Sequence, residues 1–185
     1  MVDDLLNETK ARMQKAVEAL GRELMGIRTG RANPALVERL TVDYYGAPTP
    51  LHQLASITAP EARLLVIHPW DKNSVHAIEK AILKSELRLT PASDGTLIRL
   101  SIPVLTEERR KDLMRVVHKK VEEGRVEVRN VRRDALEELR EMLKEKVISE
   151  DEQKRGQEQL QKTTDRFIEE VEAVGQQKER EIMEV

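Results

Sequence analysis

The chain has 185 residues, of which 39% are apolar and 36% charged, with no cysteine and a net charge of −2. This length allows one domain or two small ones, and the absence of cysteine excludes disulfide bonds and thiolate metal sites. No apolar run approaches the length of a membrane helix, and the first ten residues are acidic and amphipathic, unlike a signal peptide. We therefore expect a soluble globular protein of the cytoplasm.

Residues 2–28 carry apolar side chains at helical spacing, which predicts one amphipathic helix. The segment Arg28–Pro34 interrupts this spacing with a glycine and a proline, so we expect the helix to end there. A cap at the helix end explains Gly30, whereas it gives no reason for Arg31.

The sequence pattern changes in residues 35–104, which contain short β-like runs and most of the prolines. We expect these residues to form a separate module. The predicted elements are strands at 40–45, 54–58 and 63–68, a helix at about 72–87, and a hairpin with arms at 88–92 and 96–102. Asp71 suits the helix N-cap, and the pair Asp94-Gly95 suits a turn with positive φ. We expect Trp70 to fill the core of the module, with one of Tyr44 and Tyr45 pointing inward and the other outward.

Two further helices are predicted at 107–147 and 150–184, the first with Thr106 as N-cap and the second with Ser149 and Glu152 as a capping box. All three helices have narrow apolar stripes, so they should pack together. The predicted fold is α+β: an antiparallel three-helix bundle of residues 1–30 and 105–185, interrupted by a small β/α/β domain of residues 31–104.

Two short connections join the predicted domains, and such an arrangement indicates a hinge. The hinge residues are Gly30, Arg31, Ala32, Pro103, Val104 and Leu105.

The helix predicted at 107–147 has an apolar stripe and, on another side, four arginines that we call the arginine ladder: Arg125, Arg129, Arg132 and Arg133. These positions fall within about 100° around the helix, and Lys111, Arg115 and His118 lie on the same side. Residues 107–133 hold ten Lys and Arg against six Asp and Glu, whereas residues 134–185 hold nine against sixteen. A basic stripe on a near-neutral body indicates one defined anionic site.

A solvated helix face is the alternative interpretation of the ladder. We favour docking because the nearby acids Glu122, Glu127 and Asp134 lie off the ladder or at its edge, so we expect them to leave it unneutralised. Arginines also outnumber lysines there, and arginine suits bidentate contacts to phosphate. The ladder contains no aromatic residue for base stacking, so a structured RNA contacted through its backbone fits better than a single strand.

Further cations would extend the ladder in an antiparallel bundle. They are Arg28 and Arg31 at the end of the first helix and Arg110 at the start of the second.

The four histidines share no metal spacing, and no phosphate-loop, dinucleotide or nucleophile-elbow motif occurs. We therefore expect no enzyme, no metal and no cofactor. Two other classes stay open on these grounds alone: a coiled-coil adaptor or chaperone that binds a protein, and, less favoured, an enzyme that acts through the small module.

Six motifs follow one another along nearly the whole chain: Arg28–Pro34, Tyr44–Gly46 with Thr49–Leu51, Pro69–Lys72, Asp94–Thr96, Leu105–Lys111 and Arg129–Ala135. In this order they strongly resemble the motifs of bacterial ribosome recycling factors.

The resemblance implies an L-shaped protein, with a three-helix bundle and a β/α/β domain on a hinge. It implies binding to the post-termination ribosome, where the bundle contacts large-subunit ribosomal RNA. With elongation factor G and GTP, such a factor splits the subunits for another round of initiation. In the family, the arginine that matches Arg132 is the central RNA contact, with those matching Arg129, Arg28 and Arg31 nearby. We expect the chain to be a monomer.

Overall fold

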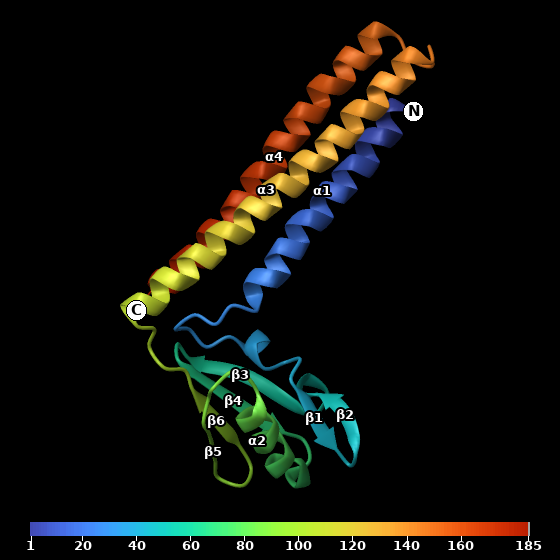
Figure 1. Ribbon diagram of the computed structural model, residues 1–185. Coiled ribbons are helices and arrows are strands. Elements are labelled where there is room, and N and C mark those ends of the chain that lie inside the picture. The colour runs from blue at the N-terminus through green and yellow to red at the C-terminus, as the bar shows by residue number, and fades with distance from the viewer. Residues whose placement is uncertain (185) are drawn as a thin grey trace. The chain divides into compact units, whose positions relative to one another are not determined.

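The computed structural model describes residues 1–184. The chain forms two compact units, each of which is described by itself (Figure 1). Unit 1 contains residues 1–24 and 111–180, and unit 2 contains residues 25–110 with the segment that begins at Glu181. Long helices in unit 1 and a small sheet with one α-helix in unit 2 confirm the predicted α+β class.

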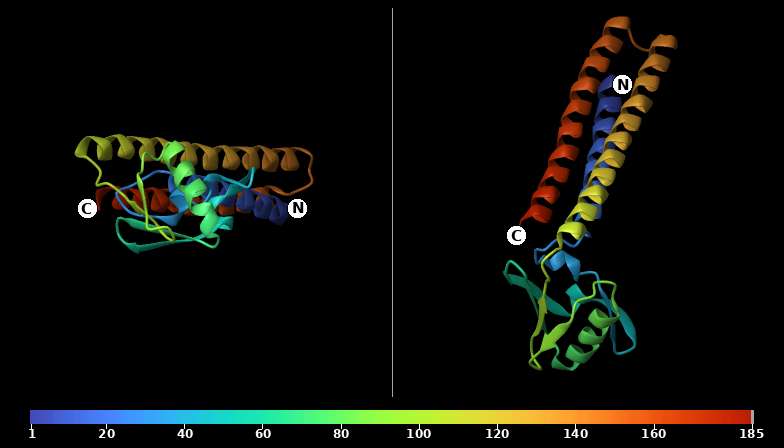
Figure 2. Two further views of the ribbon diagram at one scale, coloured as in Figure 1. Left: turned by 90° about the horizontal axis from the view of Figure 1, so that it is seen from below. Right: turned by 60° about the vertical axis from the view of Figure 1, so that its left-hand side comes forward.

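Most of the length of three long helices forms unit 1: α1 (Val2–Met25), α3 (Glu107–Lys144) and α4 (Glu150–Met183). Helix α3 runs antiparallel to both α1 and α4, as the views in Figure 2 show. The apolar stripe predicted for α3 is buried from Leu113 to Leu139, and Met142 at its end is half-buried. Phe167 and Val171 of α4 and Met13 of α1 are also fully buried. The stripe therefore forms the core of unit 1.

The predicted starts of α3 and α4 are confirmed by their caps. Thr106 Oγ1 accepts a hydrogen bond from the backbone N–H of Arg109 at 3.1 Å. Ser149 Oγ accepts from the Glu152 N–H at 3.1 Å, and the Glu152 carboxylate accepts from the Ser149 N–H at 2.7 Å. These reciprocal bonds satisfy donors that have no partner within the helix.

Helix α3 ends at Lys144, earlier than the predicted 147. The backbone N–H of Val147 bonds to the carbonyl of Met142, and that of Lys146 bonds to the carbonyl of Leu143. Lys146 has φ +59°, so this is a Schellman ending with a lysine where glycine is usual.

The predicted end of the first helix was also too late. Helix α1 ends at Met25, directly before Gly26, whereas the prediction extended it to Arg28. Glycine has a low helix propensity, which favours termination at this point. Gly30 lies beyond the helix and is not its cap.

Unit 2 contains two antiparallel sheets, helix α2 (Val75–Lys84) and three short 3₁₀ turns. One sheet pairs β1 (Thr41–Tyr44) with β2 (Ala47–Pro50). The other has the order β3-β4-β6-β5, formed by Ala55–Glu61, Leu64–Pro69, Ile98–Ser101 and Pro91–Ser93 respectively. The core joins fully buried residues of the sheets and α2: Val42, Leu65, Ile67, Ile78, Ile82, Ile98 and Leu100.

Strand β2 was missing from the prediction because Pro48 and Pro50 argue against a strand interior. The structure shows an edge strand in a tight hairpin. Its turn residues Tyr45 and Gly46 have φ of 50° and 82°, as a type I′ turn requires. The turn at Gly95 also has positive φ, at 94°, which confirms that prediction.

The expected position of Trp70 was wrong, because its side chain is 69% exposed. Side chains alternate along β4, with Leu65, Ile67 and Pro69 buried, so the next residue points outward. Tyr44 is half-buried and Tyr45 is exposed, which confirms that this pair divides between the two environments.

Candidate nucleic-acid interface

The arginine ladder lies on α3 beside α4, within unit 1. Arg125 and Arg132 reach side chains of α4, at Glu172 and Gln161 respectively. Arg129 and Arg133 bond along α3 itself. The ladder thus borders the seam between two helices, and its charge depends on the residues that α4 places opposite it.

The expectation that acids leave the ladder unneutralised was wrong for its N-terminal half. Arg125 Nη1 lies 2.9 Å from Glu122, and Arg125 Nε lies 3.3 Å from Glu172. The hydrogen bond to Glu122 and the charges of both carboxylates raise the pKa of Arg125. Arg129 Nη1 also lies 3.6 Å from Glu122. Glu122 is one turn from Arg125, and Glu172 comes from the other helix, so packing brings a charge that α3 alone does not contain.

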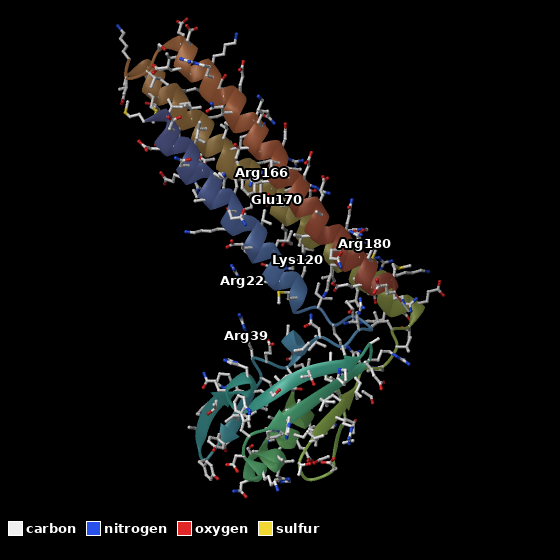
Figure 3. The ribbon with its side chains drawn as sticks, turned by 180° about the vertical axis from the view of Figure 1, so that it is seen from behind. Arg22, Arg39, Lys120, Arg166, Glu170 and Arg180 are labelled. Carbon is white, nitrogen blue, oxygen red and sulfur yellow. The ribbon has the colours of Figure 1, made fainter. Side chains whose placement is uncertain are left out.

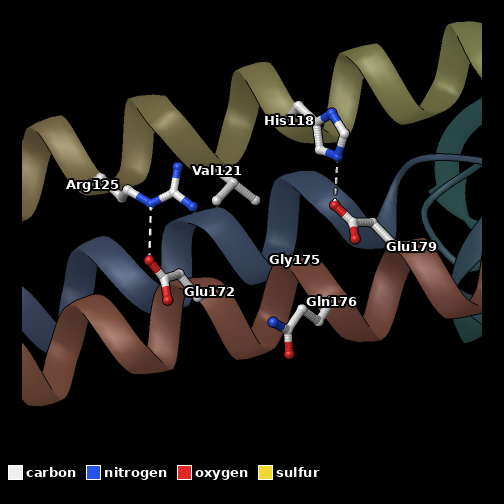
Figure 4. A pocket seen from close by; sticks show the side chains of 7 residues that line it. All are labelled: His118, Val121, Arg125, Glu172, Gly175, Gln176 and Glu179. Carbon is white, nitrogen blue, oxygen red and sulfur yellow. Dashed lines mark hydrogen bonds and ion pairs between the residues drawn. The ribbon is translucent and has the colours of Figure 1, made fainter.

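A hollow of about 360 Å³ lies at this end of the seam, between α3 and α4 (Figure 4). His118 Nε2 lies 2.7 Å from Glu179 at one side of it, and the Arg125–Glu172 pair lies at the other. Each basic side chain here faces a carboxylate, so the hollow has little excess charge with which to attract an anion.

The C-terminal half of the ladder has neutral partners. Arg132 Nη1 donates to Gln161 Oε1 at 2.8 Å, and Gln161 Nε2 donates to Asp165 at 2.8 Å. Arg133 Nη2 donates to Asn130 Oδ1 at 3.2 Å. Among residues 1–184 no carboxylate forms an ion pair with either arginine. The uncompensated charge of the ladder is therefore concentrated at Arg132 and Arg133.

Arg132 is half-buried, whereas the sequence led us to expect an exposed side chain. Its Nε atom is buried and has no hydrogen-bond partner within the described part of the chain. An arginine that lies in a seam in this way has fewer rotamers than one in free solvent, so its guanidinium is presented in a restricted range of orientations.

Two other basic side chains of unit 1, Lys120 and Arg166, are paired with carboxylates, as in the N-terminal half of the ladder (Figure 3). Lys120 lies 3.3 Å from Glu23 of α1, and the hydrogen bond to that carboxylate raises the pKa of Lys120. Arg166 lies 3.3 Å from Glu170 on α4. Arg132 and Arg133 thus differ in charge compensation from Lys120, Arg166 and the N-terminal half of the ladder.

The remaining predicted site residues, Arg28, Arg31 and Arg110, belong to unit 2. Arg28 is half-buried. Arg31 Nη1 lies 2.8 Å from the carboxylate of Glu184, a partner that the sequence pattern did not reveal. The Nε atom of Arg110 is buried and lacks a hydrogen-bond partner among residues 1–184. The extension of the ladder by these residues stays a prediction.

Sequence reasoning missed four residues of α4 along this seam. Gln161 and Glu172 bond to the ladder, Asp165 bonds to Gln161, and Glu179 lies beside His118. Their spacing of four, seven and seven residues places them on one face of a helix, so a search for such a row could have found them. The residues that the structure describes include no group of three potential metal ligands and no helix long and apolar enough to cross a membrane.

Comparison with known proteins gives the same family over almost the entire chain. The family model described as ribosome recycling factor matches residues 20–183. The chain is similar to ribosome-recycling factors of Heliobacterium modesticaldum, at 60% identity, and Thermomicrobium roseum, at 54%, with both chains covered completely in each case.

Two solved structures are similar in fold and sequence. One is described as the solution structure of the ribosome recycling factor, with a TM-score of 0.80, 49% identity, and coverage of 100% of this chain and 98% of the other. The second comes from models of the Thermus thermophilus factor and Escherichia coli elongation factor G bound to the post-termination complex, with a TM-score of 0.70, 50% identity and full coverage of both chains. The chain belongs to the ribosome recycling factor family.

Proposed function

We propose that this chain binds the post-termination ribosome in the cytoplasm as a monomer. Together with elongation factor G and GTP, it promotes separation of the ribosomal subunits so that initiation can begin again. Membership of a family of translation factors, which are not enzymes, supports this function. Support also comes from the similar structure, whose description places that factor with elongation factor G on the post-termination complex.

The observation that carries the RNA-binding part of the proposal is the uncompensated charge at Arg132 and Arg133. Their partners are amide oxygens, which a phosphate can join or replace without separating an ion pair. In contrast, a phosphate that approaches Arg125 must compete with Glu122 and Glu172. We therefore place the centre of the large-subunit RNA contact at Arg132, with Arg129 and Arg125 at its periphery.

The other predicted site residues are part of the same proposal. Arg28, Arg31 and Arg110 are further RNA contacts, and Arg31 must exchange Glu184 for phosphate to take part. Residues 1–30 and 105–185 act as the RNA-binding domain, and residues 31–104 act as the small domain.

The proposed hinge is at Gly30, Arg31 and Ala32 and at Pro103, Val104 and Leu105. A Cβ on Gly30 would lie 3.8 Å from Leu105, which supports a place where the two connections run side by side. In this mechanism, the bundle binds RNA and stays in place, while the small domain moves about the hinge.

Sedimentation with isolated large ribosomal subunits tests the function. We expect the chain to sediment with the subunits and to be released by ribonuclease. Binding that survives ribonuclease treatment would favour the protein-binding adaptor instead.

A salt titration with Arg132→Ala tests the site. This variant should bind large subunits about 1–3 kcal/mol more weakly and with a salt slope lower by about one unit, because one phosphate contact is lost. Arg166→Ala is the matched control, since it removes the same charge from an exposed arginine of α4 that is paired with Glu170. Helical circular dichroism should be retained in both. Equal binding by the two variants over the titration would contradict the assignment.

A further inference from the structure

We infer that Gln161 is a positioning residue for Arg132, and that Asp165 holds Gln161 in the orientation this requires. The inference rests on the proposed RNA-binding function of Arg132. It assigns a purpose to two exposed residues of α4: they orient the central cation of the ladder and leave its charge available.

The orientation of the Gln161 side chain follows from its two hydrogen bonds. Its oxygen must face the guanidinium of Arg132, because a guanidinium offers only donors. Its NH₂ group must face Asp165, because a carboxylate offers only acceptors. Rotation of the amide by 180° would set donor against donor and acceptor against acceptor. The two neighbours therefore select one amide orientation.

The arrangement keeps a negative charge near Arg132 without a direct ion pair. Asp165 acts through the amide, whose polarisation strengthens the Gln161 oxygen as an acceptor. A carboxylate at position 161 would itself pair with the guanidinium, and such a pair competes directly with phosphate. An amide at position 161 thus orders the Arg132 side chain and leaves the charge of Arg132 available to phosphate.

Two arginines of the ladder, Arg125 and Arg132, can be compared because each bonds to a side chain of α4. Arg125 meets Glu172 across the same seam at 3.3 Å, whereas Arg132 meets Gln161 at 2.8 Å. The two contacts link the same pair of helices through a carboxylate in one case and an amide in the other, and Arg125 has a second carboxylate, Glu122, at 2.9 Å on its own helix. The structure thus presents, across one seam, an arginine paired with carboxylates and an arginine bonded to an amide.

The decisive variant is Gln161→Glu, which changes an amide to a carboxylate of nearly the same size and helix propensity. We expect large-subunit affinity to fall about tenfold, near the lower end of the contribution of one charge-assisted contact. The salt slope should fall by about one unit, because Arg132 then releases no counterion on binding. Gln159→Glu is the control, since position 159 is exposed and lies about 160° away around α4. It should preserve both affinity and slope.

Removal of the Gln161 amide tests the ordering of Arg132 separately from any change in charge. Gln161→Ala should weaken binding about threefold through loss of side-chain order but leave the salt slope unchanged. Asp165→Ala should act in the same direction. Asp165→Asn should restore wild-type affinity, because the oxygen of asparagine still accepts from the Gln161 amide.

A measurement on the free protein detects the positioning directly. The Nε–H resonance of Arg132, assigned with Arg132→Lys, should show restricted motion by heteronuclear NOE in the wild type and greater motion in Gln161→Ala. Equal binding and slopes for Gln161→Glu and Gln159→Glu would overturn the inference, as would unchanged affinity and unchanged Arg132 mobility in Gln161→Ala. If Arg132→Ala itself binds as the wild type does, the proposed function fails, and the two failures are thereby distinguished.

Discussion

Gly175 of α4 packs directly against Val121 of α3, and a Cβ added to this glycine would overlap Val121 Cγ2. The contact allows the two helices to approach closely beside the hollow formed with His118 and Arg125. Valine is stiff at χ1, so it has little freedom to move out of the way.

Gly175→Ala should therefore lower the free energy of unfolding by about 1–2 kcal/mol, because overpacking outweighs the better helix propensity of alanine. Gly21→Ala is the internal control, since no heavy atom lies within 4 Å of the added Cβ and the residue is inside α1. That change should raise stability by about 0.5–1 kcal/mol. Urea denaturation of both variants measures the difference, and a shift of the same sign in both would contradict the packing argument.

Glu172→Gln tests whether carboxylates beside the N-terminal half of the ladder lower its affinity for RNA. The amide preserves a hydrogen-bond acceptor for Arg125 and removes one of its two compensating charges. Large-subunit binding should strengthen about two- to fivefold, with a salt slope steeper by up to about one unit. Glu170→Gln makes the same change beside Arg166, so it serves as the control. Equal strengthening in both variants would indicate a general effect of net charge rather than a local one.

The capping box of α4 predicts a stability change with a defined pH dependence. Ser149→Ala should cost about 1 kcal/mol in urea denaturation at neutral pH, whereas Ser149→Thr should retain most of the cap. The hydrogen bond from the Ser149 backbone lowers the pKa of Glu152. The stabilisation from Glu152 is thus present above the ordinary carboxyl pKa and is lost as the pH falls through the lowered value. Wild-type stability that does not decrease over this acidic range would oppose the assignment.

The hairpin turn between β5 and β6 contains a second acid-sensitive group. Backbone N–H donors of Leu97 and Thr96 and the Thr96 hydroxyl lower the pKa of Asp94 to about 2. The contribution of Asp94 to the free energy of unfolding should therefore be present at neutral pH and disappear as the pH falls from about 4 to about 2. A carboxyl ¹³C titration gives the pKa directly. Asp94→Asn should remove this part of the pH dependence, and an ordinary titration of Asp94 near pH 4 would refute the predicted bonds.

The boundaries that sequence reasoning found correctly are those with local chemistry. Thr106, Ser149 and Glu152 interact with residues three positions away, so a short window contains all the information. Strand β2 was missed because its two prolines obscure a hairpin whose turn has the necessary backbone angles. Trp70 was misplaced because its size suggested a core residue, whereas the alternation along β4 directs it outward.

The location of the ladder was predictable, but its charge compensation was not. Helical spacing places four arginines on one side of α3 from sequence alone. The contrast between Arg125 and Arg132 depends on which residues of α4 lie opposite, namely Glu172 and Gln161. That register is set by the packing of two helices, which neither helix encodes separately.

The prolines of β2 also affect how copies of this chain meet one another. With a two-residue turn between Tyr44 and Ala47, positions 48 and 50 are those at which a residue's N–H would point away from β1. Proline has no N–H, so the free edge of β2 offers no donor at either position. An unprotected edge would recruit a strand from another molecule and begin aggregation. Pro48 and Pro50 therefore protect the hairpin against edge-to-edge self-association.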